Sequence, residues 1–144
     1  ILKWFYSIFD HYLKWNRTKE YKMDINSIWV NEMKAGDYNP VHIHQGRIYT
    51  GLSSVMILKL PKDMGPEIAR PDQPMNGQLQ MMGSASGQFV SADYSPQMKI
   101  GDFYVFPYDV RHVVYPFTNK KAKRRTLVCN VDVEYNPVAS RTTQ

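Results

Sequence analysis

Apolar side chains recur with a helical period in the first segment of the chain. They stand at intervals of three and four residues, at Ile1, Leu2, Phe5, Ile8, Phe9, Tyr12 and Leu13. This spacing places them on one face of a helix, so we expect a helix over residues 1–17. The basic tract from Lys14 to Lys22 then leads to Asp24 and Asn26, which we expect to form a turn.

From residue 27 onward the pattern is that of extended strands, with apolar and polar positions alternating and Gly, Pro or Asn at the ends. Strands are expected in SIWVNEM, VHIH, IYTGLSSVMILKLP, QLQMM, GQFVSADY, QMKIGDFYVFP, HVVYPF and KRRTLVCNVDVEY. Residues 61–77 contain four of the nine prolines and no periodicity, so we expect an irregular loop or lid there.

One helix followed by seven or eight short strands predicts a protein dominated by β-structure. The fold that we expect is a double-stranded β-helix, the jelly-roll or cupin-like architecture, with an N-terminal helix. A chain of 144 residues has the size of one domain. We therefore expect a single domain over residues 1–144, with the strand core at about 27–133 and a short C-terminal tail.

Composition argues against several classes of protein. No run of about 18 apolar residues is present, so we expect no membrane-spanning helix. The single cysteine, Cys129, excludes an internal disulfide and a cysteine-rich zinc module, and it agrees with a reducing, cytoplasmic location. The net charge is +5, but a cluster at residues 120–125 carries much of it. A nucleic-acid-binding protein more often has a basic stripe interleaved with aromatic residues, so we do not expect that function.

Two histidines stand one residue apart in the segment NPVHIHQG. On an extended strand, side chains at i and i+2 point to the same side, so His42 and His44 can reach one metal ion. The alternative is a chance pair on an exposed strand. His112 follows GDFYVFPYDVR, and a jelly roll brings such a distant strand beside the first. Three protein ligands with open positions are typical of a catalytic metal, although imidazoles suit iron, zinc, copper and nickel alike.

Twelve residues after His112, the segment RRTLVCN offers a candidate clamp for an anion. Alternation along the strand places Arg124, Thr126 and Asn130 on one face and Arg125 and Cys129 on the other. An arginine and a threonine two residues apart can bind a carboxylate through a bidentate, charge-assisted pair and one further hydrogen bond. The alternative is that both arginines are solvated at the end of a basic turn.

The order of these motifs resembles the 2-oxoglutarate/Fe(II)-dependent oxygenase superfamily. Within it, the chain is most similar to the prolyl-4-hydroxylase-like branch encoded by tailed phages, including cyanophages. The resemblance covers about residues 27–133. It lies in the segments WVNEMKAGDYNPVHIHQG, LSSVMILKLP, GDFYVFPYDVRHVVYPF and RRTLVCN.

The resemblance implies a role for each matching residue. His42 and His112 match the two histidine ligands of iron, and His44 stands where most of the superfamily has Asp or Glu. Arg124 matches the arginine that pairs with the distal carboxylate of 2-oxoglutarate, and Thr126 matches the Ser or Thr two residues on. Further candidate contacts to this cosubstrate are Tyr104, Tyr49 and Asn130.

The expected function is a dioxygenase that uses Fe(II), 2-oxoglutarate and O2 to hydroxylate a peptide, with peptidyl proline favoured, or a small molecule. It would act in the cytoplasm, that of the host if the protein is phage-encoded. Replacing a carboxylate by His44 leaves the metal one negative charge short. Three alternatives remain open: His44 is itself a ligand, which we favour; Asp37 or Asp109 completes the site instead; or the protein has lost the reaction.

Two other functions remain open on the sequence alone. One is a cupin-like enzyme with three histidine ligands that does not use 2-oxoglutarate. The other is a non-catalytic phage β-sandwich module whose basic turn at residues 120–125 contacts an acidic partner.

Overall fold

The protein is described by a computed structural model that covers residues 1–67, 72–84 and 87–138. The described residues form one helix and seven strands: α1 (Leu2–Trp15), β1 (Tyr21–Lys34), β2 (Asn39–His42), β3 (Gly51–Lys59), β4 (Leu79–Met82), β5 (Phe103–Pro107), β6 (Arg111–Val114) and β7 (Lys123–Tyr135). None of their helices is long and apolar enough to cross a membrane.

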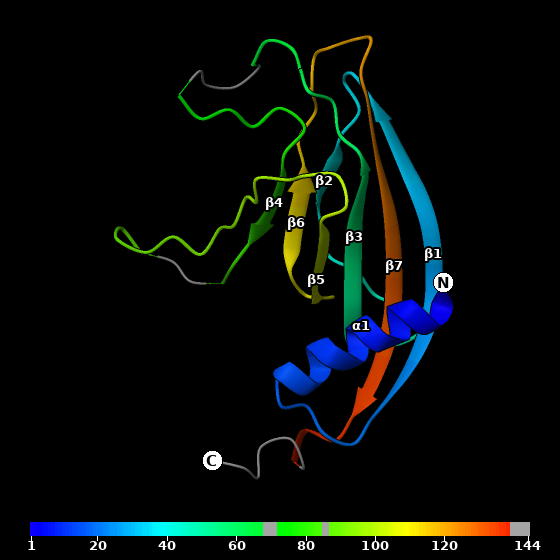
Figure 1. The fold of residues 1–144 in the computed structure, drawn as a ribbon. Coiled ribbons are helices and arrows are strands. Elements are labelled where there is room, and N and C mark those ends of the chain that lie inside the picture. The colour runs from blue at the N-terminus through cyan, green and yellow to red at the C-terminus, as the bar shows by residue number, and fades with distance from the viewer. Residues whose placement is uncertain (68–71, 85–86, 139–144) are drawn as a thin grey trace.

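The strands form two antiparallel sheets, one of four strands in the order β1-β7-β3-β5 and one of three in the order β2-β6-β4. Figure 1 shows the two sheets as layers, with α1 lying across one side of the larger sheet. A cluster of buried side chains from both sheets fills the space between them; it includes Val55, Ile57, Leu79, Val114 and Val128. The predicted jelly-roll fold with an N-terminal helix is confirmed.

Helix α1 packs through the apolar face that the sequence predicts. Phe5, Phe9 and Leu13 are buried against the outer face of the four-stranded sheet, where Cys129 and Val131 of β7 meet them. Because side chains on a strand alternate, the same strand β7 turns its even-numbered residues from 124 to 130 toward the other sheet. The helix therefore covers one face of β7 and leaves the opposite face for the interior between the sheets.

The predicted turn at Asp24 and Asn26 is wrong. Both residues lie within β1, which pairs with β7 from Tyr21 onward. The ladder shifts register between Ile25 and Ser27, so Asn26 occupies a β-bulge. Pairing with the long strand β7 outweighs the local turn preference, and the bulge absorbs the residue that does not fit the ladder.

The strand predicted in GQFVSADY is also wrong within the described residues. Residues 87–93 form no strand, and Phe89 is 97% exposed. The segment meets the small sheet through one isolated bridge, between Met81 and Tyr94. Exposed apolar residues without a partner strand do not form a ladder, whatever their β-propensity. The expected loop at 61–77 has no helix or strand in its described parts, while residues 68–71 lie outside the described residues.

Candidate metal centre

Strands β2 and β6 bring two of the three predicted histidines together. His42 of β2 and His112 of β6 are register partners, and their ring centroids are 4.2 Å apart. His112 is buried at 3% exposure, while His42 is half-buried. Although 69 residues lie between the two histidines in the sequence, their rings are neighbours in space. Antiparallel pairing places opposite residues of two strands side by side.

His44 joins them from outside the strand. Strand β2 ends at His42, so the expectation that both histidines lie on one extended strand is wrong. The backbone N–H of His44 instead donates to the carbonyl of Tyr108 at 2.9 Å, which ties the segment to the turn after β5. Nε2 of His44 then lies 3.1 Å from Nε2 of His112. One ligand atom from each of His42, His44 and His112 lies within 4.8 Å of the others.

A buried carboxylate anchors the segment that follows His44. Asp132 of β7 accepts hydrogen bonds from the Asn26 amide at 2.8 Å, the Tyr108 hydroxyl at 3.0 Å and the Arg47 backbone N–H at 3.0 Å. A Cβ at Gly46 would lie 1.8 Å from Asp132 Oδ1, so this position requires glycine for its close approach. Gly46 and Asp132 therefore fix the path of the backbone directly after His44.

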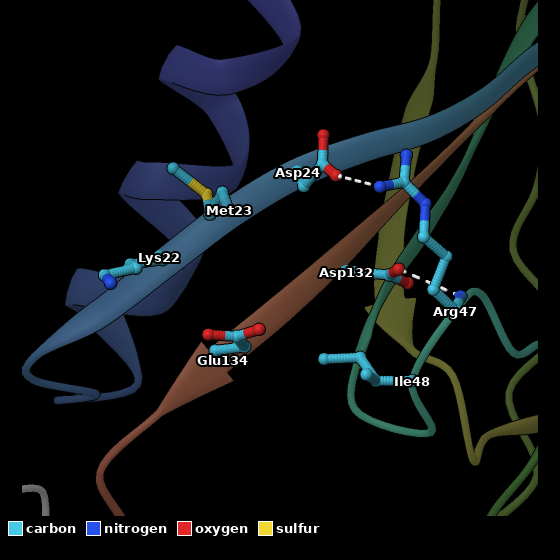
Figure 2. Close-up of a pocket in the computed structure, with 7 residues that line it drawn as sticks. All are labelled: Lys22, Met23, Asp24, Arg47, Ile48, Asp132 and Glu134. Carbon is cyan, nitrogen blue, oxygen red and sulfur yellow. Dashed lines mark hydrogen bonds and ion pairs between the residues drawn. The ribbon is translucent and has the colours of Figure 1, made fainter.

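This anchor borders a hollow of about 320 Å³ that contains none of the three histidines. Figure 2 shows Arg47 between two carboxylates: its backbone N–H faces Asp132, and its guanidinium pairs with Asp24 at 2.9 Å. Because these charged groups already pair with one another, we assign the hollow no chemistry.

The tautomers of His42 and His112 suit metal binding. Nδ1 of His42 lies 2.6 Å from the carbonyl oxygen of Pro40, and Nδ1 of His112 lies 2.9 Å from that of Val110. A carbonyl can only accept a hydrogen bond, so each Nδ1 carries the proton and each Nε2 presents a lone pair. Nitrogen ligands at about 2.1 Å from an ion and at nearly right angles are about 3 Å apart, close to the observed 3.1 Å between His44 and His112.

His44 and His112 are also held in the neutral state that a ligand requires. Burial, with smaller contributions from His112 and His42, lowers the pKa of His44 to about 4. Burial likewise lowers the pKa of His112. Neither ring has to lose a proton to bind a metal at neutral pH.

Arg124 lies on the inner face of β7 with no carboxylate partner among the described residues. It is 1% exposed, and its Nη1 and Nη2 donate to the sulfur atoms of Met33 at 3.9 Å and Met98 at 3.5 Å. Its Nε has no partner within the part of the chain that the structure describes. Burial lowers the pKa of the guanidinium to about 10, so it is still charged at neutral pH. A thioether is a weak acceptor, so this buried cation lacks the counter-charge that it needs.

Arg124 and the histidines line the same cavity, of about 50 Å³. The cavity is lined by Trp29, Asn31, Asn39, His42, His44, Val55, Leu79, His112, Val114, Arg124, Thr126 and Val128. Sequence reasoning missed Asn31 and Asn39 in this set and, above all, Trp29, whose ring centroid is 6.4 Å from that of His44. Alternation along β1 could have found Trp29 and Asn31, because they share a face with the buried Met33.

Arg125 points the other way, to the solvent side of β7. Its Nε donates to Glu32 at 3.0 Å, and Lys123 pairs with the same carboxylate at 2.9 Å. The pKa of Glu32 is lowered to about 2 by its hydrogen bonds with Lys123 and Arg125. Arg125 is therefore partnered at the surface, whereas Arg124 faces the cavity.

The other candidate contacts lie away from Arg124. The Tyr104 hydroxyl donates to Asp102 at 2.9 Å, and Tyr49 is 83% exposed. Neither lines the cavity of Arg124. Asn130 is buried beside His44, with its Nδ2 3.2 Å from His44 Nδ1.

The two carboxylates considered as substitutes for His44 are exposed. Asp37 accepts a hydrogen bond from the Lys34 backbone at 2.8 Å. Neither Asp37 nor Asp109 belongs to the histidine group, which within the described residues contains histidines alone.

Two solved structures share this fold at low sequence identity. An oxidoreductase of the 2OG-Fe(II) oxygenase family from Burkholderia pseudomallei matches with a TM-score of 0.55 and 16% identity, over 77% of this chain and 45% of its own. A prolyl-4-hydroxylase from Pseudomonas putida matches with a TM-score of 0.51 and 18% identity, over 85% of this chain and 57% of its own. This chain thus spans about half the length of these two structures. A comparison with curated protein sequences found no match.

A sequence model of one family matches most of the strand core. Its description is "Putative 2OG-Fe(II) oxygenase", and the match covers residues 27–130. This range contains the three histidines, Arg124 and Thr126, and it runs from β1 into β7. The chain belongs to this 2OG-Fe(II) oxygenase family.

Proposed function

We propose that the protein is a 2-oxoglutarate- and Fe(II)-dependent dioxygenase. Its metal ligands are His42, His44 and His112, and Arg124 binds the distal carboxylate of 2-oxoglutarate. The observation that carries this proposal is a buried guanidinium that has no carboxylate partner among the described residues and lies in the same cavity as three converging imidazoles.

The surroundings of Arg124 fit an anionic ligand. Burying an unpaired charge costs several kcal/mol, and a carboxylate that pairs with it would offset part of this cost. A carboxylate would replace the two weak sulfur contacts with charge-assisted hydrogen bonds. Thr126 lies two residues further along β7 and lines the same cavity, which supports a role for its hydroxyl as a further donor to the same ligand.

The histidines fit Fe(II) by number and spacing, and His42 and His112 fit it by tautomer as well. Three imidazoles occupy one side of an ion and leave the other positions for cosubstrate and oxygen. When bound, iron, 2-oxoglutarate and O2 supply the oxidising chemistry of the family. Three neutral ligands leave the full 2+ charge of the metal uncompensated, and the dianionic 2-oxoglutarate offsets it. His44 in place of a carboxylate therefore makes metal and cosubstrate binding more dependent on each other.

Turnover with a matched pair of arginine variants tests this function. Protein loaded anaerobically with Fe(II) should convert 2-oxoglutarate to succinate when O2 is admitted. Arg124→Met should raise the concentration of 2-oxoglutarate needed for half-maximal turnover by at least about 30-fold, the loss of a charge-assisted pair. Arg125→Met, one residue away but on the solvent side, should change it less than about twofold. If Arg124→Met and Arg125→Met changed the half-maximal concentration of 2-oxoglutarate equally, Arg124 would be excluded as the residue that binds its carboxylate.

For the substrate we propose a peptide, with a prolyl side chain as the first to test. The support is the likeness of fold to the Pseudomonas putida prolyl-4-hydroxylase and the half-exposed Trp29 in the lining of the cavity. An aromatic ring at such a place can pack on a pyrrolidine ring. Short proline-containing peptides should stimulate succinate release, and mass spectrometry should find a gain of one oxygen atom. Stimulation by free amino acids alone would contradict a peptide substrate.

The three-histidine site favours one second candidate, a cupin-like metal enzyme that uses no oxoacid. The two candidates differ in the response of the metal to 2-oxoglutarate. Titration of 2-oxoglutarate into the Co(II)-loaded protein should change the visible spectrum if the cosubstrate binds the metal. If the spectrum stays unchanged and 2-oxoglutarate does not displace a competing dicarboxylate from the protein, the second candidate is favoured.

A further inference from the structure

We propose that Asn130 is a positioning residue that sets the tautomer of His44 and so controls whether His44 can bind the metal. This inference rests on the metal site of the proposed function but not on its 2-oxoglutarate chemistry. It concerns the one ligand that departs from the family pattern.

Asn130 is placed to act on His44 alone. It lies on β7 at 5% exposure, between Ser27 of β1 and Ser53 of β3 in the sheet register. Its Nδ2 is 3.2 Å from His44 Nδ1, and its Oδ1 is buried with no hydrogen-bond partner in residues 1–67, 72–84 and 87–138. His42 and His112, by contrast, have their Nδ1 atoms fixed by backbone carbonyls.

In the arrangement observed, His44 cannot be a ligand through Nε2. The Asn130 amide N–H2 donates to His44 Nδ1, so the proton of the neutral ring must be on Nε2. That N–H then donates to Nε2 of His112, at 3.1 Å. The Nε2 proton of His44 thus lies between the two imidazoles, in the place where the Nε2 lone pairs of His44 and His112 would bind a metal ion.

Rotation of the Asn130 amide by half a turn reverses this arrangement. Oδ1 would then accept from His44 Nδ1–H, and Nε2 would present its lone pair as the other two histidines do. The amide oxygen and nitrogen are nearly equal in size, so the rotation needs no extra space. Metal binding therefore requires Asn130 as an acceptor.

The proposal is tested by metal affinity and by the tautomer itself, both without 2-oxoglutarate. Competition with a chelator gives the Zn(II) affinity, and NMR of ¹⁵N-histidine-labelled protein identifies the protonated nitrogen of His44. For Asn130→Ala we expect a 10- to 100-fold loss of Zn(II) affinity, the usual effect of removing a hydrogen-bond partner of a ligand. For Asn130→Asp, which can only accept, we expect affinity at or above that of the wild type. The proton should then be on Nδ1 even before metal is added.

Asn31→Ala is the matched control, because Asn31 lines the same cavity from β1. It should leave the His44 tautomer unchanged and the Zn(II) affinity within about threefold of the wild type, well below the effect expected at Asn130. Wild-type affinity in Asn130→Ala, or an equal loss in Asn130→Asp, would overturn the role of Asn130. A wild-type protein that binds no Zn(II) would overturn both this inference and the metal site. Protein that follows the expected affinity series but never consumes 2-oxoglutarate would overturn the proposed function alone.

Discussion

Arg124 donates to the sulfur of Met98 at 3.5 Å, so the most deeply buried cation of the described chain contacts a thioether where a carboxylate would be expected. Met33, its register partner on β1, supplies a second sulfur at 3.9 Å. Sulfur is a weak acceptor and makes a poor substitute for a counter-charge. This relationship predicts opposite effects of one substitution on stability and on function.

Arg124→Met should stabilise the ligand-free fold while it abolishes the response to 2-oxoglutarate. The methionine keeps much of the side-chain length and removes a desolvated charge, and replacing buried charges by apolar groups is often stabilising by about 1–4 kcal/mol. Urea unfolding without ligands measures the free energy of unfolding. A thermal-shift titration with 2-oxoglutarate should raise the melting temperature of the wild type and leave that of the variant unchanged. If the variant were less stable than the wild type, the guanidinium would have to stabilise the ligand-free fold, contrary to this prediction.

His44→Asp should retain metal binding, whereas His44→Ala should lose it by at least about 10-fold. Asp restores the carboxylate that most of the superfamily has at this position, and its negative charge offsets part of the metal charge. The measurement is Fe(II) affinity under anaerobic conditions, with His11→Ala as the control because His11 lies on α1, outside the histidine group. Wild-type affinity in His44→Ala would remove His44 from the ligand set.

The fold was largely readable from the sequence because period and strand length are local properties. KRRTLVCNVDVEY matches β7 from Lys123 to Tyr135, and its alternation separates Arg124 from Arg125 correctly. Asp24 and Asn26 were misassigned because the partner of β1 lies more than 100 residues away, and no local window shows it. The strand predicted at residues 87–93 was wrong because these residues, although partly apolar, have no neighbouring strand to pair with.

The site was harder to predict from the sequence than the fold, because it is formed by contacts between distant segments. The three histidines and Arg124 could be proposed from motif order, and the structure places them around one cavity. Asp132, which anchors the segment after His44, was missed even though it shares the inward face of β7 with Asn130. The position of Asn130 against His44 depends on where β2 ends, and a pattern of residue types does not fix that point to within one residue.

Cys129 should be unreactive while the protein is folded. It lies on the face of β7 that α1 covers, it is fully buried, and burial raises the pKa of its thiol to about 12. Since the thiolate is the reactive form, labelling by a disulfide reagent at pH 8 should be slow and should follow unfolding. Addition of denaturant should release one fast-reacting thiol in step with the loss of β-structure. Rapid labelling of the native protein would show that α1 leaves the sheet.

Two aspartates on either side of Arg47 should differ sharply in their importance. Asp24 pairs with the guanidinium at the surface, where an ion pair contributes about 0–1 kcal/mol, so Asp24→Ala should change stability and Zn(II) affinity little. Asp132→Ala removes a buried acceptor of three hydrogen bonds and leaves the Asn26, Tyr108 and Arg47 donors without it. We expect a loss of about 3 kcal/mol or more in the free energy of unfolding and weaker Zn(II) binding, because the segment after His44 loses its anchor. Asp132→Asn keeps the shape of the side chain and one acceptor, so its free energy of unfolding should lie between those of the wild type and Asp132→Ala. Unchanged Zn(II) affinity in a folded Asp132→Ala protein would show that the bond from His44 N–H to the Tyr108 carbonyl is sufficient to hold the ligand in place.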